Sequence, residues 1–252
     1  MLFLAGGEHF QRGGSGDPPR KDSLEHIYVM ANLVYLDAGR APYAPTLRLQ
    51  ERQVAEVRAA DPERAYLVLV EHEPPVITLG RGADAAHVVA SAGRLQAEGI
   101  ELHPASRGGD VTYHGPGQLV GYPILRLDLH GRDVHRYLRD LEEVLIRLLA
   151  RFGIEGGRAE GKTGVWVGPE KVAAIGVAIR RWVTYHGFAL NVCPNLRHFD
   201  LIVPCGIRGK GVTSLEKLLG RPVPVAEVKA PLVECMLEVF GFAGATAGEA
   251  HT

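Results

Sequence analysis

The spacing of apolar residues predicts a long amphipathic helix over residues 133–152. Apolar side chains recur there at intervals of three and four residues, the spacing that gathers them on one face of a helix. Asp133 is a suitable N-cap, and Gly153 suits the position just past the C-terminal end. Residues 47–57 and 225–240 are predicted to form two further helices.

Short apolar runs predict the strands. Residues 66–70 are continuously apolar, which is typical of a buried strand, and residues 76–79 form a second extended piece. Residues 165–167 and 172–179 lie on either side of a Gly-Pro-Glu turn and predict a hairpin, and residues 188–192 predict another strand. Strands and helices in this mixed order indicate a single α/β (α+β) domain with a mixed β-sheet flanked by helices.

The two ends of the chain differ from its middle. Residues 1–29 are rich in Gly, Pro and charged residues and show no hydrophobic period, so we expect a flexible N-terminal extension. Met30 is then an alternative start of the native chain. We expect the folded domain to span residues 30–245 and a C-terminal tail to follow over residues 246–252.

Composition narrows the class of protein. Hydrophobic residues make up 46% and charged residues 23%, which is typical of a folded globular domain rather than a disordered chain. A formal net charge of -1 argues against a general nucleic-acid binder, and no apolar run is long enough to predict a membrane span. The first residues lack the basic start of a signal peptide, so we expect a cytoplasmic protein.

The three cysteines argue against a disulfide framework and a metal centre, because they are few, odd in number and lack paired C-x-x-C spacing. Cys205 stands between Pro204 and Gly206 at the end of an apolar run. A thiol on such a turn is a nucleophile if its pKa is depressed, although an inert buried cysteine is the commoner case. Cys235 lies among apolar residues of the last predicted helix and is expected to pack in the core.

Three residues are candidates for the group that would activate Cys205. Lys171 opens an apolar strand, and a nearby ammonium stabilises a thiolate. His114 would instead give a Cys–His dyad, as in cysteine hydrolases, and the residues alone leave this choice open. Lys162 is a rival of Lys171, in a Gly-Lys-Thr sequence that mimics the end of a phosphate-binding loop. No strand leads into that sequence and a hairpin follows it, so we exclude a nucleotide triphosphatase.

Residues 107–118 form a segment rich in Gly and Pro. Glycines let a backbone come close to a ligand, and successive amides can form a nest for an anion or a carbonyl group. Arg107 adds a planar fork that suits a carboxylate or a phosphate. A long structural hairpin loop is the alternative interpretation, and composition favours neither.

Several segments, in the same order along the chain, resemble the octanoyltransferase family of protein lipoylation, also called lipoyl(octanoyl) transferases. They are residues 71–81, 107–123, 171–176, 187–191 and 204–207 with 211–214. The resemblance spans residues 33–240. The family shares a core with lipoate and biotin protein ligases, so the resemblance implies a mixed-sheet domain flanked by helices.

The resemblance also implies a reaction, the transfer of an octanoyl group from octanoyl-acyl carrier protein to a specific lysine of lipoyl domains, as in 2-oxoacid dehydrogenase complexes. Cys205 would carry the acyl group as a thioester, and Lys171 would lower the pKa of its thiol and later act as base. No cofactor, metal, nucleic acid or membrane is implied, and no ATP is needed because the donor thioester is already activated. The residues that would line the substrate site are Arg107, Gly108, Gly109, Asp110, Val111, Thr112, Tyr113, His114, Ala174, Ile175, Gly176, Gly187, Phe188 and Ala189.

Other functions are compatible with parts of the pattern. An ATP-dependent lipoate–protein ligase would use the same core and would not need Cys205. A Cys/His amidase would use His114 as base and water as acceptor. A non-catalytic module would bind a lipoyl domain and tolerate loss of the cysteine.

Overall fold

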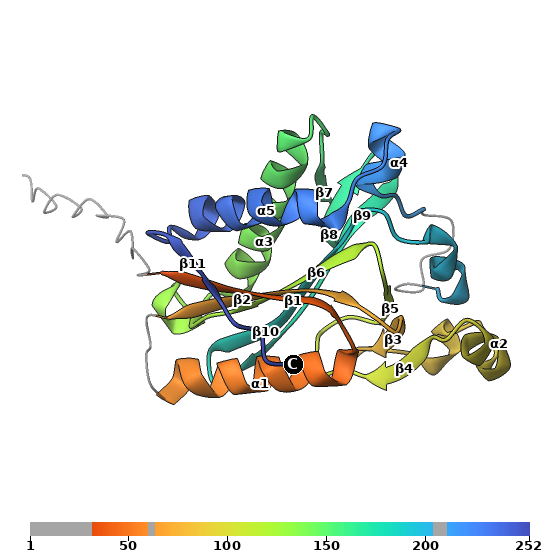
Figure 1. Cartoon of the computed structure of the whole chain (residues 1–252), viewed down its shortest axis with the longest axis horizontal. Coiled ribbons are helices and arrows are strands. Elements are labelled where there is room, and N and C mark those ends of the chain that lie inside the picture. The colour runs from red at the N-terminus through yellow and green to blue at the C-terminus, as the bar shows by residue number, and fades with distance from the viewer. Residues whose placement is uncertain (1–31, 60–63, 204–210) are drawn as a thin grey trace, which may run out of the picture.

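A computed structural model describes residues 32–59, 64–203 and 211–252 (Figure 1). Its strands are β1 (Leu33–Ala41), β2 (Ala65–His72), β3 (Val76–Leu79), β4 (Glu101–Pro104), β5 (Val111–His114), β6 (Gln118–Ile124), β7 (Gly157–Ala159), β8 (Lys162–Val167), β9 (Glu170–Arg180), β10 (Val183–Asn191) and β11 (Ala245–Gly248). Its α-helices are α1 (Tyr43–Ala59), α2 (Ala92–Ala97), α3 (Val134–Arg151), α4 (Leu215–Leu219) and α5 (Val225–Phe240). Within these residues, eight strands form a mixed sheet in the order β11-β1-β2-β6-β10-β9-β8-β7.

Helices cover both faces of this sheet, with α3 and α5 on one face and α1 on the other (Figure 1). Alternation along β2 explains the layers, because neighbouring residues of a strand point to opposite faces. Leu67 and Leu69 belong to the core that α3 and α5 cover, whereas Val68 and Val70 belong to the core that packs against α1. The apolar run is therefore a strand buried on both faces, and the predicted fold class is confirmed.

The helix ends follow from their capping residues. The Asp133 carboxylate accepts a hydrogen bond from the Arg136 N–H at 3.0 Å, and Gly153 follows the helix with a φ of 71°, as predicted. α5 has the predicted bounds, and the β8–β9 hairpin is confirmed. α1 begins at Tyr43, earlier than predicted, because Pro45 is tolerated in a first turn, where amides lack intrahelical partners.

A second, smaller sheet has the order β4-β3-β5 within the described residues and lies beside α2 (Figure 1). Val111 and Tyr113 of β5 are buried in its core together with Ile77 of β3 and Leu95 of α2. β5 pairs antiparallel with β3. The interpretation of residues 107–118 as one long loop is therefore wrong, because alternating apolar residues make part of this segment a strand.

The C-terminal residues take part in the fold. β11 pairs in parallel with β1 at the edge of the large sheet, so the predicted tail over residues 246–252 begins inside the sheet. Its small residues carry no clear strand signal, and pairing with an open edge decides their conformation. The predicted extension over residues 1–29, Met30 and Cys205 lie outside the described residues. None of the helices described here is long and apolar enough to cross a membrane.

Candidate active site

A cavity of about 400 Å³ lies where residues of β5, β6, β8, β9 and β10 meet. Two segments that the sequence assigns to the substrate site are neighbouring strands on its wall, where Gly176 pairs with Gly187 and Ile175 with Phe188. Its volume is within the range of small-molecule sites. The predicted substrate residues on its wall are Arg107, Gly108, Gly109, Asp110, Val111, Thr112, His114, Ala174, Ile175, Gly176, Gly187, Phe188 and Ala189.

Tyr113 is the predicted substrate residue that lies away from this wall. It is buried in the core of the small sheet, where its hydroxyl and His198 Nδ1 are 2.6 Å apart and hydrogen bonded. His114 is on the cavity wall, and successive residues of a strand point to opposite faces. Tyr113 therefore supports the wall from behind.

The wall also contains residues that the sequence did not predict. His186 could have been found, because it directly precedes the predicted residues Gly187, Phe188 and Ala189 in the sequence. Tyr43 and Thr78 carry no such signal, since they reach the cavity from elements distant in the sequence. Lys162, the rival of Lys171, is also on this wall. The unpredicted wall residues are Tyr43, Thr78, Gln118, Val120, Tyr122, Leu138, Gly161, Thr163, Val177, His186, Asn191, Phe199 and Val212.

Arg107 brings a buried positive charge to the cavity wall, with 8% of the residue exposed. Its Nε and Nη2 donate to the Thr78 hydroxyl, Nη2 also donates to the Thr78 carbonyl, and Nη1 donates to the Gly108 carbonyl. A Cβ on Gly176 would lie 3.1 Å from both Arg107 Cδ and the Gly108 carbonyl oxygen. Glycine at position 176 thus lets the glycine-rich segment lie directly on β9.

The histidines around the cavity are neutral at physiological pH. Burial lowers the pKa of His114 to about 3, with the neighbouring His72 as the next cause. His114 Nδ1 donates to Gln118 Oε1 at 2.7 Å, because the amide nitrogen of Gln118 donates to Asn191. Burial likewise lowers the pKa values of His72 and His186 to about 4.

Lys171 lies on the cavity wall, near the start of β9. Its Nζ donates to the Thr163 carbonyl at 3.3 Å and lies 4.8 Å from the centre of the Trp166 ring. Its backbone N–H donates to the Gly211 carbonyl, and its carbonyl accepts from the Thr213 N–H. The chain that follows Cys205 thus pairs with the backbone of Lys171.

The described cysteines are poor nucleophiles. Cys235 is fully buried in α5, which confirms its predicted place in the core, and burial raises the pKa of its thiol. Cys193 is half-buried, and its pKa is raised by burial and by the carboxylates of Glu216 and Glu71. Among residues 32–59, 64–203 and 211–252, no three His, Cys, Asp or Glu side chains are grouped to hold a metal ion.

The family model of the lipoyl protein ligase A/B catalytic domain matches residues 42–237. The chain belongs to this family. Among its relatives, an octanoyltransferase of Syntrophotalea carbinolica is 52% identical over 197 residues, 78% of this chain and 89% of that one. One of Rubrobacter xylanophilus is 52% identical over 82% of this chain and 92% of that one. One of Myxococcus xanthus is 50% identical over 80% of this chain, which spans 58% of that longer protein.

These relatives confirm the resemblance to octanoyltransferases and the prediction of an acyltransferase. Solved structures of lower identity share the fold. Lipoate-protein ligase A bound with ATP has a TM-score of 0.71 at 18% identity, covering 87% of this chain and 89% of that one. A bipartite lipoate protein ligase of Thermoplasma acidophilum has a TM-score of 0.68 at 16% identity, covering 88% of each chain.

Proposed function

We propose that this chain transfers an octanoyl group from octanoyl-acyl carrier protein to a lysine of a lipoyl domain in the cytoplasm, as an early step of protein lipoylation. The names of its relatives support octanoyl transfer. The observation that carries the proposal is the cavity, whose lining combines apolar side chains with Lys171. Val212, seven residues after Cys205, is on the same wall, which supports a pairing of Cys205 with Lys171.

The apolar wall suits a fatty acyl chain. Val120, Ile175, Val177 and Phe188 line it, and Ala174 leaves room between the larger side chains. An eight-carbon chain gains about 0.8 kcal/mol for each buried CH₂, or roughly 5 kcal/mol in total. This energy would hold the acyl group while its carbonyl reacts near Lys171.

In the first step of the proposed reaction, Lys171 takes the proton of the Cys205 thiol. The thiolate attacks the thioester carbonyl, a new C–S bond forms, and the C–S bond to the carrier protein breaks. The ammonium of Lys171 returns the proton to the departing thiolate of the carrier. Exchange of one thioester for another is nearly neutral in free energy, so no ATP is consumed.

In the second step, the amine of the acceptor lysine attacks the acyl group on Cys205. A C–N bond forms, the C–S bond breaks, and the amine proton passes to Lys171 and then to the Cys205 thiolate. A free lysine has a pKa of about 10.4, so the acceptor amine needs a base as it attacks. Backbone amides of the glycine-rich segment are candidates to stabilise the oxyanion.

The proposal is tested by supplying the purified chain with octanoyl-acyl carrier protein and an unmodified lipoyl domain, without ATP. We expect the mass of the lipoyl domain to increase by one octanoyl group. A parallel reaction contains free octanoate and ATP in place of the carrier-bound donor. Modification only in that reaction would identify an ATP-dependent ligase and contradict the proposal.

A further inference from the structure

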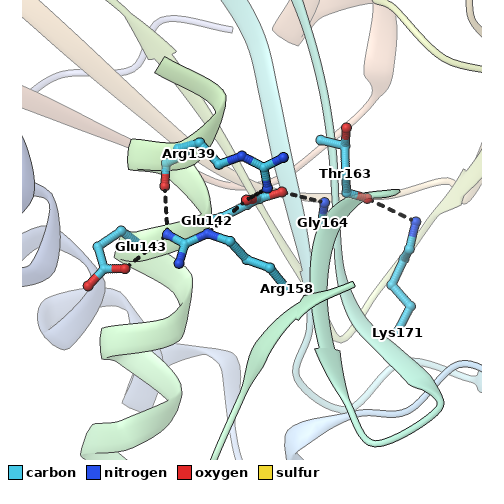
Figure 2. A network of polar contacts seen from close by, with 7 residues as sticks. All are labelled: Arg139, Glu142, Glu143, Arg158, Thr163, Gly164 and Lys171. Atoms are coloured by element: carbon cyan, nitrogen blue, oxygen red, sulfur yellow. Dashed lines mark hydrogen bonds and ion pairs between the residues drawn. The ribbon is translucent and has the colours of Figure 1, made fainter. Parts of the chain in front are cut away.

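A buried carboxylate lies behind Lys171, outside the cavity wall. Glu142 of α3 has a side chain that is 1% exposed, and its Oε1 accepts the Gly164 N–H at 3.1 Å. Its Oε2 accepts from Arg139 Nη1 at 2.6 Å and from Arg158 Nε at 3.0 Å (Figure 2). Burial of a carboxylate costs free energy unless the group is paired with a cation and hydrogen bonded. The two arginines and the Gly164 N–H provide this pairing and these hydrogen bonds.

One peptide group connects this carboxylate to Lys171. The N–H of the Thr163–Gly164 peptide points to Glu142, and the C=O of the same peptide accepts from Lys171 Nζ (Figure 2). A peptide group is planar, so fixing its N–H also fixes the direction of its carbonyl. We propose that Glu142 is a positioning residue for Lys171, which holds the Thr163–Gly164 peptide in the orientation that places the Lys171 amine at the cavity.

The backbone at Gly164 shows why this peptide needs an anchor. Gly164 has a φ of 115°, and a Cβ there would lie 2.6 Å from the Ala173 carbonyl oxygen. The pairing of β8 with β9 shifts register close to this peptide, between Val165 and Trp166. An irregular ladder does not fix the peptide plane by itself, so the charge-assisted hydrogen bond to Glu142 supplies the constraint.

Glu143 provides a matched control on the same helix. Its carboxylate accepts from Arg158 Nη2 at 3.0 Å and from Arg147 Nε at 3.1 Å. The Gly164 N–H donates to Glu142 instead. Glu143→Gln therefore changes the charge and the arginine pairing of this cluster and leaves the acceptor of the Gly164 N–H in place. Glu143 is more exposed, at 33%, so the control tests the loss of charge and arginine pairing, and the comparison of Lys171 with a distant lysine tests the positioning role itself.

The experiment uses trace acetylation of the whole protein without substrate, followed by peptide mass spectrometry. The labelling rate of Lys171 is compared with that of Lys229, which is bonded to Asp37 far from the cavity. In Glu142→Ala, relative labelling of Lys171 rises by about three- to tenfold, the equilibrium factor of one lost hydrogen bond. Glu142→Gln, which keeps an acceptor oxygen, gives an intermediate rate and serves if the alanine variant does not fold.

The rate of octanoyl transfer is the second measurement. The positioning role of Glu142 matters for catalysis only if Lys171 has its proposed function. Glu142→Ala lowers kcat by about tenfold or more with the KM of the octanoyl donor unchanged, and Glu143→Gln keeps both values. Unchanged labelling of Lys171 in both Glu142 variants would overturn the positioning role. A labelling change with normal transfer would support the positioning role and contradict the catalytic use of Lys171.

Discussion

At the scale of single residues, the surroundings of Lys171 and His114 favour different roles. His114 is buried, its Nδ1–H is bound to Gln118, and its pKa is lowered to about 3 by burial. A general base works best when its pKa is near the operating pH, and so weak a base takes a proton poorly. Lys171 lies beside the chain that follows Cys205, so the choice that the sequence left open favours Lys171.

Replacing each candidate base separates the two roles. Lys171→Ala is expected to lower kcat for octanoyl transfer by about 10²- to 10⁴-fold, the usual worth of a general base. His114→Gln keeps a side-chain donor for Gln118 and is expected to lower kcat by less than about tenfold. Single-turnover transfer assays measure both variants. An equal loss in His114→Gln would support the Cys–His alternative instead.

At the scale of elements, sequence periodicity predicted the parts that are locally regular. The helix after Asp133 and the β8–β9 hairpin have clear apolar periods and turn residues, and both are confirmed. β5 was missed because glycines surround it and its partner β3 lies far away in the sequence. Tyr43 and Thr78 were missed because they are distant in sequence from the other cavity residues and reach the cavity only in the folded chain. The role of Cys205 stays a prediction.

The pairing of β6 with β10 depends on glycine at a point of close approach. A Cβ on Gly187 would lie 2.2 Å from the Gly121 carbonyl oxygen, which is backbone and cannot rotate away. Gly187→Ala is therefore expected to lower the free energy of unfolding by about 1–3 kcal/mol or more, the usual cost of overpacking. Urea denaturation of Gly187→Ala and of the parent chain measures this difference in unfolding free energy.

Gly93→Ala is the control for that substitution. Gly93 lies in α2 with open space around it, and alanine favours a helix by roughly 0.5–1 kcal/mol over glycine. The same denaturation experiment should show equal or greater stability for Gly93→Ala. Equal stability of Gly187→Ala and the parent would contradict the close approach of β6 and β10.

At the scale of the whole molecule, buried histidines at and beside the cavity couple stability to pH. The pKa values of His72 and His186 in the fold are about 4, below the value of about 6.5 expected in the unfolded chain. The unfolded state therefore binds more protons between these values. Stability is fully present above about pH 6.5 and is lost as the pH falls toward 4.

Denaturation curves between pH 7 and pH 4.5 test this coupling. Each such histidine contributes up to about 1.4 kcal/mol of unfolding free energy per pH unit in that window. His186→Gln is expected to reduce the slope by about that amount, because its pKa in the fold is lowered to about 4. An unchanged slope in His186→Gln would show that His186 takes up its proton in the folded state.

The central claim, that Cys205 carries the acyl group, is tested most directly by intact mass spectrometry. The full chain is incubated with octanoyl-acyl carrier protein and no acceptor, alongside Cys205→Ser and Cys193→Ser. We predict one octanoyl adduct that maps to Cys205, is released by hydroxylamine and passes to added lipoyl domain. It should persist in Cys193→Ser, because the raised pKa of Cys193 makes it a poor nucleophile. No adduct, with transfer continuing in Cys205→Ser, would contradict the claim.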